Sequence, residues 1–254
     1  MRYYGLMYLA AFFFTYILVL YRIRNENYEY SKETIQDYFA WAVAGLIVGA
    51  RFGYVLFYNF EYYINHPLRI IFPFDLTNGL RYVGISGMSY HGGAIGVILA
   101  SIIFCHKHRI NFWNFADLFA AAIPLGYTFG RIGNFINGEL YGRVTAVPWG
   151  MYFPLDPYHR LRHPSQLYEA LFEGIFLFAV LWILRKKRWL DGLLFSLYLI
   201  GYGTARFFIE FFRETDPQLG CVLWFLSMGQ VLCVIMVLCG AGIMIAVSRP
   251  ETGR

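Results

Sequence analysis

The stretch Gly126-Tyr-Thr-Phe-Gly-Arg-Ile-Gly-Asn-Phe-Ile-Asn-Gly-Glu-Leu-Tyr-Gly-Arg143 decides how this chain is built. It opens as the second half of an apolar segment and ends in polar residues spaced by glycines. A charge inside a membrane helix costs at least about 2.5 kcal/mol unless it is paired or serves a ligand. Nine consecutive residues of this stretch, 131–139, contain four polar or charged side chains: Arg131, Asn134, Asn137 and Glu139. They indicate a site for an anion that faces a cavity.

The composition around this stretch is that of a membrane protein. Of the 254 residues, 58% are hydrophobic and only 15% are charged, and the mean hydropathy is +0.47. A soluble domain cannot bury so much apolar surface, so the class is a polytopic helical membrane protein whose partner is the lipid bilayer. The net charge of +5 does not indicate a nucleic-acid partner, because the basic residues are scattered between apolar runs.

Seven apolar runs are long enough to cross a bilayer, at roughly 20 residues per crossing. The sequence therefore predicts an all-α fold, with residues 1–254 as a single transmembrane domain. The predicted spans are about 3–21, 36–58, 84–104, 115–136, 167–184, 191–212 and 222–247.

The orientation of the spans follows from the Lys and Arg residues in the loops. Loops 22–35, 105–114 and 185–190, together with the C-terminal tail, hold eleven Lys and Arg residues, and the longer loops of the other side hold seven. Short loops rich in these residues stay on the cytoplasmic side. The N-terminus is therefore predicted outside and the C-terminus inside. Loops 59–83 and 137–166, rich in Pro and aromatic residues, form a small outward-facing cap.

The cysteines predict no metal or redox site. The chain has four cysteines, Cys105, Cys221, Cys233 and Cys239. Their spacing is not that of metal ligands, and three of them lie in or beside apolar helix. We interpret them as small buried hydrophobic residues, and we expect no metal and no cofactor.

Glycine spacing predicts which spans pack closely. Gly92 and Gly96 form a G-x-x-x-G pattern in the third span, and Gly126 and Gly130 form another in the fourth. Such patterns let helix backbones approach, so we expect these two spans to pack together. Pro124 is expected to kink the fourth span.

A second polar stripe lies in the sixth span. Tyr202, Arg206 and Glu210 recur every four residues, and Arg213 follows three residues later. Arg206 and Arg131, from separate helices, can clamp a phosphate, because a guanidinium group binds phosphate oxygens in a bidentate way.

A purely structural alternative exists for these arginines. Arg206 can instead pair with Glu210, and Arg131 with Glu139. Glu169 and Glu173, one helical turn apart near the start of the fifth span, are expected to neutralise embedded arginines.

The run Gly130-Arg-Ile-Gly-Asn-Phe-Ile-Asn-Gly-Glu-Leu-Tyr-Gly142 resembles the signature of the bacterial prolipoprotein diacylglyceryl transferase family. Six further segments match the family in order: YGLMY at 4–8, GARFGY at 49–54, MSYHGG at 88–93, RHPSQLYE at 162–169, GYGTARF at 201–207 and EFFR at 210–213. The resemblance extends from about Tyr4 to Gln230.

The resemblance implies a reaction in the bacterial plasma (inner) membrane, with the active site towards the outer leaflet. The diacylglyceryl group of phosphatidylglycerol moves to the lipobox cysteine next to the signal peptide of a preprolipoprotein. The products are a thioether and glycerol 1-phosphate, and no metal or nucleotide takes part. An alternative function is a lipid or anionic-solute transporter that uses the same arginines.

The resemblance also implies roles for individual residues. Catalysis falls to His91, Arg131, Glu139, Arg206, Tyr4 and Tyr202, and phosphatidylglycerol binding to Arg131, Asn134, Asn137, Gly142 and Arg206. Structural or supporting roles fall to Arg51, Glu169, Glu210 and Arg213. The base stays open between His91, which can exchange a proton near neutral pH, and a tyrosine or the thiol itself activated by Arg206.

Overall fold

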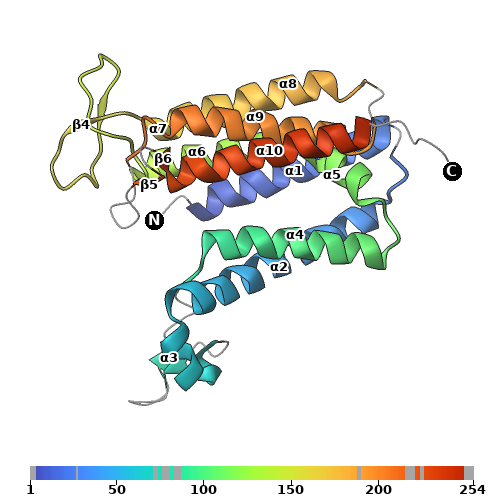
Figure 1. Cartoon of the computed structure of the whole chain (residues 1–254), viewed down its shortest axis with the longest axis horizontal. Helices are drawn as coiled ribbons and strands as arrows, with labels where there is room; N and C mark the ends of the chain where they lie inside the picture. Colours follow the sequence, from blue (N-terminus) through green and yellow to red (C-terminus); the bar gives the residue numbers. More distant parts are fainter. Residues whose placement is uncertain are drawn as a thin grey trace. The chain divides into compact units, whose positions relative to one another are not determined.

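The computed structural model describes residues 4–26, 28–70, 74–75, 81–82, 87–187, 190–214, 221–223 and 226–248. The chain is mostly helical (Figure 1) and divides into two compact units. The first unit holds Met1–Tyr28 and Trp113–Arg254, and the second holds Glu29–Phe112.

Within the described residues, four helices are long and apolar enough to cross a membrane: Gly5–Asn25, Lys32–Tyr58, Ser165–Leu184 and Met228–Ser248. Two shorter apolar helices, Gly92–Lys107 and Leu193–Ile209, accompany them. These helices cover six of the predicted spans, which confirms the mostly helical membrane character of the chain.

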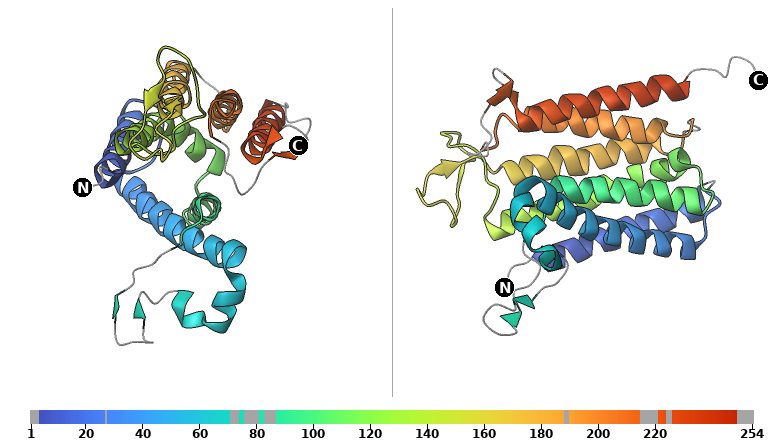
Figure 2. Two further views of the ribbon diagram at one scale, coloured as in Figure 1. Left: turned by 90° about the vertical axis from the view of Figure 1, so that its left-hand side faces the viewer. Right: turned by 60° about the horizontal axis from the view of Figure 1, so that its bottom comes forward.

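The first unit is a bundle of helices. Its elements are α1 (Tyr4–Asn25), α5 (Phe112–Ala120), α6 (Ile123–Asn137), α7 (Ser165–Glu169), the π-helix η2 (Ala170–Phe176), α8 (Leu177–Leu184), α9 (Leu193–Ile209) and α10 (Met228–Ser248). Helix α1 packs along α6, and α9 packs along α10 (Figure 2). The segments α7, η2 and α8 form one continuous helical run that packs against both α6 and α9.

Short hairpins lie outside the helices of this unit, so the chain is mostly helical with few strands. Strands β3 (Met151–Tyr152) and β4 (Leu161–Arg162) pair within the predicted loop 137–166. Strands β5 (Cys221–Leu223) and β6 (Leu226–Ser227) pair just before α10. The helix of the seventh predicted span therefore starts at Met228 rather than at 222, because residues 221–223 and 226–227 form strands.

The predicted fourth span, 115–136, is two helices rather than one kinked helix. A turn separates α5 from α6, and Pro124, near the start of α6, has no N–H to continue an earlier helix. The carbonyls at the end of α5 find another donor. Arg22 of α1, 1% exposed, donates from Nη1 to Asp117 O at 2.7 Å and to Leu118 O at 2.6 Å.

The side chain of Asp117 connects the end of α5 to the start of α9 by hydrogen bonds. Its carboxylate accepts hydrogen bonds from Gly192 N at 2.8 Å and from Phe195 N at 2.7 Å. The first N–H groups of a helix have no partner within it, so this distant carboxylate does the work of a cap. Ala120 of α5, Leu181 of α8 and Leu194 of α9 belong to one cluster of buried apolar residues.

The second unit is a tightly packed helix pair with a small extension. Helix α2 (Lys32–Tyr58) packs along α4 (Tyr90–Lys107). After α2 come the short helix α3 (Phe60–Asn65), the 3₁₀ helix η1 (Pro67–Ile70) and the paired strands β1 (Phe74–Asp75) and β2 (Arg81–Tyr82). Helix α4 begins at Tyr90, later than the predicted residue 84; residues 83–86 lie outside the described part.

Glycines on both helices form the seam between α2 and α4. A Cβ on Gly53 would lie 2.6 Å from Gly92 Cα, and one on Gly45 would lie 2.7 Å from Gly96 O. Side chains cannot fit at such distances, so the backbones are in direct contact. The glycines of α4 therefore pack against α2.

The predicted packing of the third span against the fourth through their glycines is thus wrong. In α6, Gly126 faces α1, where a Cβ would lie 2.5 Å from Thr15 Oγ1 and 3.2 Å from Ala11 O. Gly130 has no neighbour within 4 Å in the described structure. A G-x-x-x-G pattern indicates that another helix can pack closely against the glycines, but it does not indicate which helix does so.

Candidate active site

A fully buried carboxylate of the first unit is surrounded by arginines. Glu169, at the end of α7, is 0% exposed and meets three arginines. Arg131 Nε lies 2.7 Å from its Oε2, and Arg206 Nη1 and Arg213 Nη1 lie 3.2 Å and 3.0 Å from its Oε1. These arginines come from α6, from α9 and from the turn after α9. A buried carboxylate is tolerable only with such compensation.

The second carboxylate, Glu173, lies in the π-helix η2, one turn beyond Glu169. The Tyr127 hydroxyl donates to its Oε2 at 2.5 Å and itself accepts from Arg131 Nε at 2.7 Å. Glu173 Oε1 lies 3.8 Å from Arg206 Nη1. The neighbouring Gly174 permits this arrangement, because any Cβ there would overlap Thr128 of α6.

The third carboxylate, Glu210, completes the site. Arg206 Nη2 lies 2.9 Å and Arg213 Nε 3.5 Å from its Oε2, and Ser227 Oγ donates to its Oε1 at 3.1 Å. Gly229 of α10 leaves the space that this carboxylate fills. We call these three arginines and three glutamates the arginine–carboxylate cluster: Arg131, Arg206, Arg213, Glu169, Glu173 and Glu210. With every member ionised, their formal charges cancel.

The end of α6 brings the signature residues beside Arg131. Asn134, 6% exposed, accepts from Arg131 Nη1 on its Oδ1 at 3.3 Å. Asn137 Nδ2 is buried and has no hydrogen-bond partner among the described residues. Glu139 takes part through its backbone, since its carbonyl accepts from Gln166 Nε2 at 2.6 Å. Arg131 pairs with Glu169, so its expected alternative partner, Glu139, is not its ion-pair partner here.

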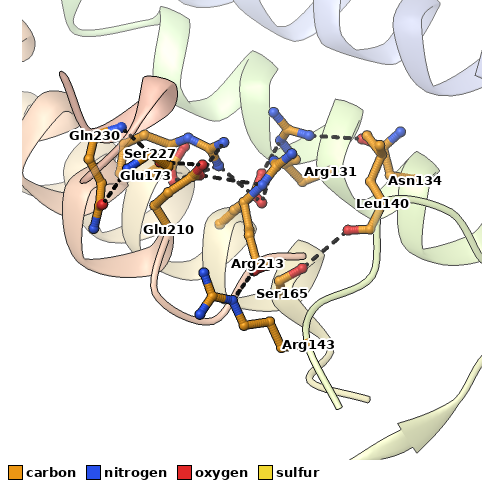
Figure 3. A network of polar contacts seen from close by, with 12 residues as sticks. Arg131, Asn134, Leu140, Arg143, Ser165, Glu173, Glu210, Arg213, Ser227 and Gln230 are labelled. Atoms are coloured by element: carbon orange, nitrogen blue, oxygen red, sulfur yellow. Dashed lines mark hydrogen bonds and ion pairs between the residues drawn. The ribbon is translucent and has the colours of Figure 1, made fainter. Parts of the chain in front are cut away.

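The loop from 138 to 166 is bound to the backbone that carries Arg213. Gly142 N donates to His163 O at 2.8 Å, and Arg143 N donates to Phe212 O at 2.9 Å. Arg143 Nε also donates to Arg213 O at 2.7 Å (Figure 3). A Cβ on Gly142 would overlap Phe212 O and lie 2.8 Å from His163 Cβ. Gly142 is therefore where two backbone segments touch.

An ion pair stabilises the same loop further out. Arg162 binds Asp156 through two parallel hydrogen bonds of 2.9 Å each, and its Nη1 donates to Glu214 at 2.8 Å. The hydrogen bonds from Arg162 hold the pKa of the Asp156 carboxyl well below its ordinary value of 3.8.

Of three other predicted residues, one belongs to the second unit and two have side chains outside the described part. Arg51 belongs to the second unit, where it donates from Nε to Ile70 O and from Nη2 to Arg69 O, both at 2.7 Å, and so holds the end of η1. His91 lies in the first turn of α4, and Tyr4 begins α1; both side chains lie outside the described part. Tyr202 packs its ring against Tyr127, with 5.6 Å between centroids.

Tyr127 is the site residue that sequence reasoning missed. It links Arg131 to Glu173 by hydrogen bonds. In the sequence, nothing in the residue type distinguishes it from the many other aromatic residues of the chain. The available signal was spacing, because Tyr127 precedes Arg131 by four residues and so shares its helix face.

Together, the fold and the cluster define a class: a helical membrane protein with arginines gathered around carboxylates inside its bundle. Comparison with known proteins narrows the class. A family profile described as prolipoprotein diacylglyceryl transferase matches residues 1–246.

Relatives named phosphatidylglycerol–prolipoprotein diacylglyceryl transferase match along almost the whole chain. The protein of Chlorobaculum tepidum is 54% identical over 245 residues, which cover 96% of this chain and 85% of that protein. That of Campylobacter hominis is 47% identical over 241 residues, 94% of this chain and 84% of the relative. A Campylobacter jejuni protein is 47% identical over 237 residues, 92% and 85% respectively. The chain belongs to the prolipoprotein diacylglyceryl transferase family.

Proposed function

We propose that this chain transfers the diacylglyceryl group of phosphatidylglycerol to the lipobox cysteine thiol of a preprolipoprotein, and that Arg131 and Arg206 hold the lipid phosphate during the transfer. Membership of the family and the names of the relatives support the reaction. The observation that carries the assignment of the site is that two guanidinium groups from different helices, α6 and α9, meet the same buried carboxylate, that of Glu169.

The donors that hold a carboxylate can also hold a phosphate. Both ligands offer oxygens to the fork of a guanidinium group, and charge-assisted hydrogen bonds to them are among the stronger ones. The thiolate attacks a glycerol carbon, and the phosphate ester leaves with the electron pair of the broken C–O bond. Arg131 and Arg206 stabilise the negative charge that grows on the leaving phosphate. Glu169 keeps both guanidinium groups oriented for this task.

The remaining signature residues extend the phosphate site. The unpaired Asn137 Nδ2 is a donor available to a head-group oxygen, and Asn134 orients Arg131. Tyr202 supports Tyr127 from α9. His91 and Tyr4 keep the roles that the resemblance implies, as a candidate proton acceptor and a wall of the substrate cavity.

We propose further that the chain crosses the bacterial inner membrane seven times. The N-terminus and the loops 59–83 and 137–166 lie outside, and the site opens towards the outer leaflet. The excess of Lys and Arg in the short loops supports this orientation, with α5 and α6 together making one interrupted crossing. Phosphatidylglycerol reaches the site from the bilayer, and the signal peptide brings the cysteine.

The test uses purified protein in phosphatidylglycerol nanodiscs with a lipobox peptide, and it measures thioether and glycerol phosphate together. Wild type forms both in equal amounts, and a peptide with Ser in place of Cys yields neither. Arg131→Ala and Arg206→Ala each abolish the reaction while the protein stays folded. Arg206→Lys, which keeps the charge but loses the fork, lowers the rate by about 10²-fold. A transporter would release no glycerol phosphate, and that result would overturn the proposal.

A further inference from the structure

The two neighbouring carboxylates of the cluster have unequal partners. Glu169 faces three guanidinium groups at 2.7, 3.0 and 3.2 Å. Glu173 is equally buried, at 0% exposed, but its nearest guanidinium nitrogen, on Arg206, is 3.8 Å away. Its Oε1 has no hydrogen-bond partner among the described residues. The π-helix that begins after Glu169 separates the two environments, and such segments are frequent at functional sites.

An unpartnered oxygen on a buried, ionised carboxylate is costly. A proton on the Glu173 carboxylate removes the buried charge where compensation by arginines is poorest. A proton on Glu169 would instead leave three arginines without their shared counter-ion. Glu173 is therefore the carboxylate of the pair that is suited to take up a proton.

A hydroxyl connects Glu173 to the arginine that holds the phosphate. Tyr127 donates to Glu173 Oε2 at 2.5 Å, accepts from Arg131 Nε at 2.7 Å and lies 3.2 Å from Glu169 Oε2. It can pass its own proton to Glu173 while it receives another on the same oxygen.

Building on the proposed function, we propose that Glu173 is the terminal acceptor of the cysteine proton and that the Tyr127 hydroxyl relays it. In the step, the S–H bond breaks and its proton moves to the Tyr127 oxygen as the Tyr127 proton moves to Glu173. The sulfur electron pair forms the S–C bond to glycerol, and the C–O electron pair leaves with the phosphate. Glu173 afterwards returns the proton to the departing glycerol phosphate.

Charge conservation inside the site favours this acceptor. The formal charges of the ionised cluster cancel, so the lipid phosphate brings the total to −1. During the step the phosphate gains one negative charge and Glu173 loses one, so the total stays the same. An acceptor outside the cluster would leave an extra negative charge inside, where low dielectric makes a charge change expensive. The groups that face Glu173 are Tyr127, Arg131, Glu169 and Arg206, with Tyr202 behind Tyr127.

The test is the pH dependence of single-turnover thioether formation between about pH 6 and pH 9, below and around the ordinary thiol pKa of about 8.5. Glu173→Gln should lower the rate at pH 7 by at least about 10²-fold. Below about pH 8 its remaining rate should rise about tenfold per pH unit, because only thiolate formed in solution can then react. Wild type should lack this slope.

Matched variants separate the possible acceptors. Glu210→Gln removes another carboxylate of the cluster, and His91→Asn removes the other candidate acceptor. Whatever their absolute rates, neither variant should show the rise of the rate with pH that is expected for Glu173→Gln. Tyr127→Phe breaks the relay, so its rate should rise with pH as that of Glu173→Gln does. This variant tests the proposal if Glu173→Gln fails to fold. A flat profile in Glu173→Gln or in Tyr127→Phe, or a slope in His91→Asn, overturns the proposal. If wild type makes no thioether, the proposed function itself has failed.

Discussion

Gly142→Ala is expected to act through the backbone, although the resemblance assigns Gly142 to lipid binding. The new Cβ would overlap Phe212 O and lie 2.8 Å from His163 Cβ. Ordinary carbon contacts begin near 3.5 Å, so the neighbouring segment must withdraw by about 1 Å. The 2.9 Å hydrogen bond from Arg143 N to Phe212 O then lengthens beyond the usual range. Arg213, which pairs with Glu169 at 3.0 Å, moves with that segment.

The magnitude follows from these contacts. Overpacking costs about 1–3 kcal/mol and one lost hydrogen bond about 1 kcal/mol, so the free energy of unfolding should fall by about 2–4 kcal/mol. A displacement of about 1 Å near the reacting groups can lower the transfer rate by about 10²-fold. The measurements are unfolding in detergent and thioether formation in nanodiscs.

Gly242→Ala is the matched control. A Cβ at Gly242 has no neighbour within 4 Å in the described structure, and alanine favours the interior of α10 by about 0.5–1 kcal/mol. Its transfer rate should equal that of wild type. If Gly142→Ala keeps wild-type stability but loses affinity for phosphatidylglycerol, Gly142 acts on the lipid directly. The explanation by backbone contact is then refuted.

Three further predictions concern stability. Arg22→Ala should lower the free energy of unfolding by about 3–5 kcal/mol, because it removes a buried charge that holds two carbonyls and a carboxylate. The control, Arg24→Ala at an exposed position, should change the free energy of unfolding by less than about 0.5 kcal/mol. Equal effects of the two variants in denaturant titrations would contradict this prediction. Asp156→Asn should lower the melting temperature at pH 7. Arg162 depresses the pKa of Asp156 below 3.8, so the contribution of this ion pair to the stability of the folded protein is complete above pH 3.8 and is lost as the pH falls below it. The melting temperatures of the variant and of wild type should therefore converge only in acid. Convergence already at pH 5 would be inconsistent with this ion pair. Gly96→Leu should separate α2 from α4 and lower thermal stability, and unchanged melting would count against the close seam.

Most helices could be predicted from the sequence because their signal is local. An apolar run such as 228–248 is helical in a bilayer wherever its neighbours lie, since every backbone group must find a partner within the segment. The interruption of the fourth span could not be predicted in the same way. Whether the helix continues through this region or ends and restarts near Pro124 depends on a donor for the carbonyls at the end of α5. That donor, Arg22, lies 95 residues away from Asp117 in the chain.

The sequence by itself determined that this chain is a helical membrane protein of the transferase family, with Arg131 and Arg206 embedded in it. Only the tertiary structure decided that both meet Glu169, that Tyr127 joins Arg131 to Glu173, and that the glycines of α4 pack against α2. The physical reason is distance along the chain. Hydropathy and helical periodicity are properties of neighbouring residues, whereas ion pairs and backbone contacts between helices depend on how separate helices come together.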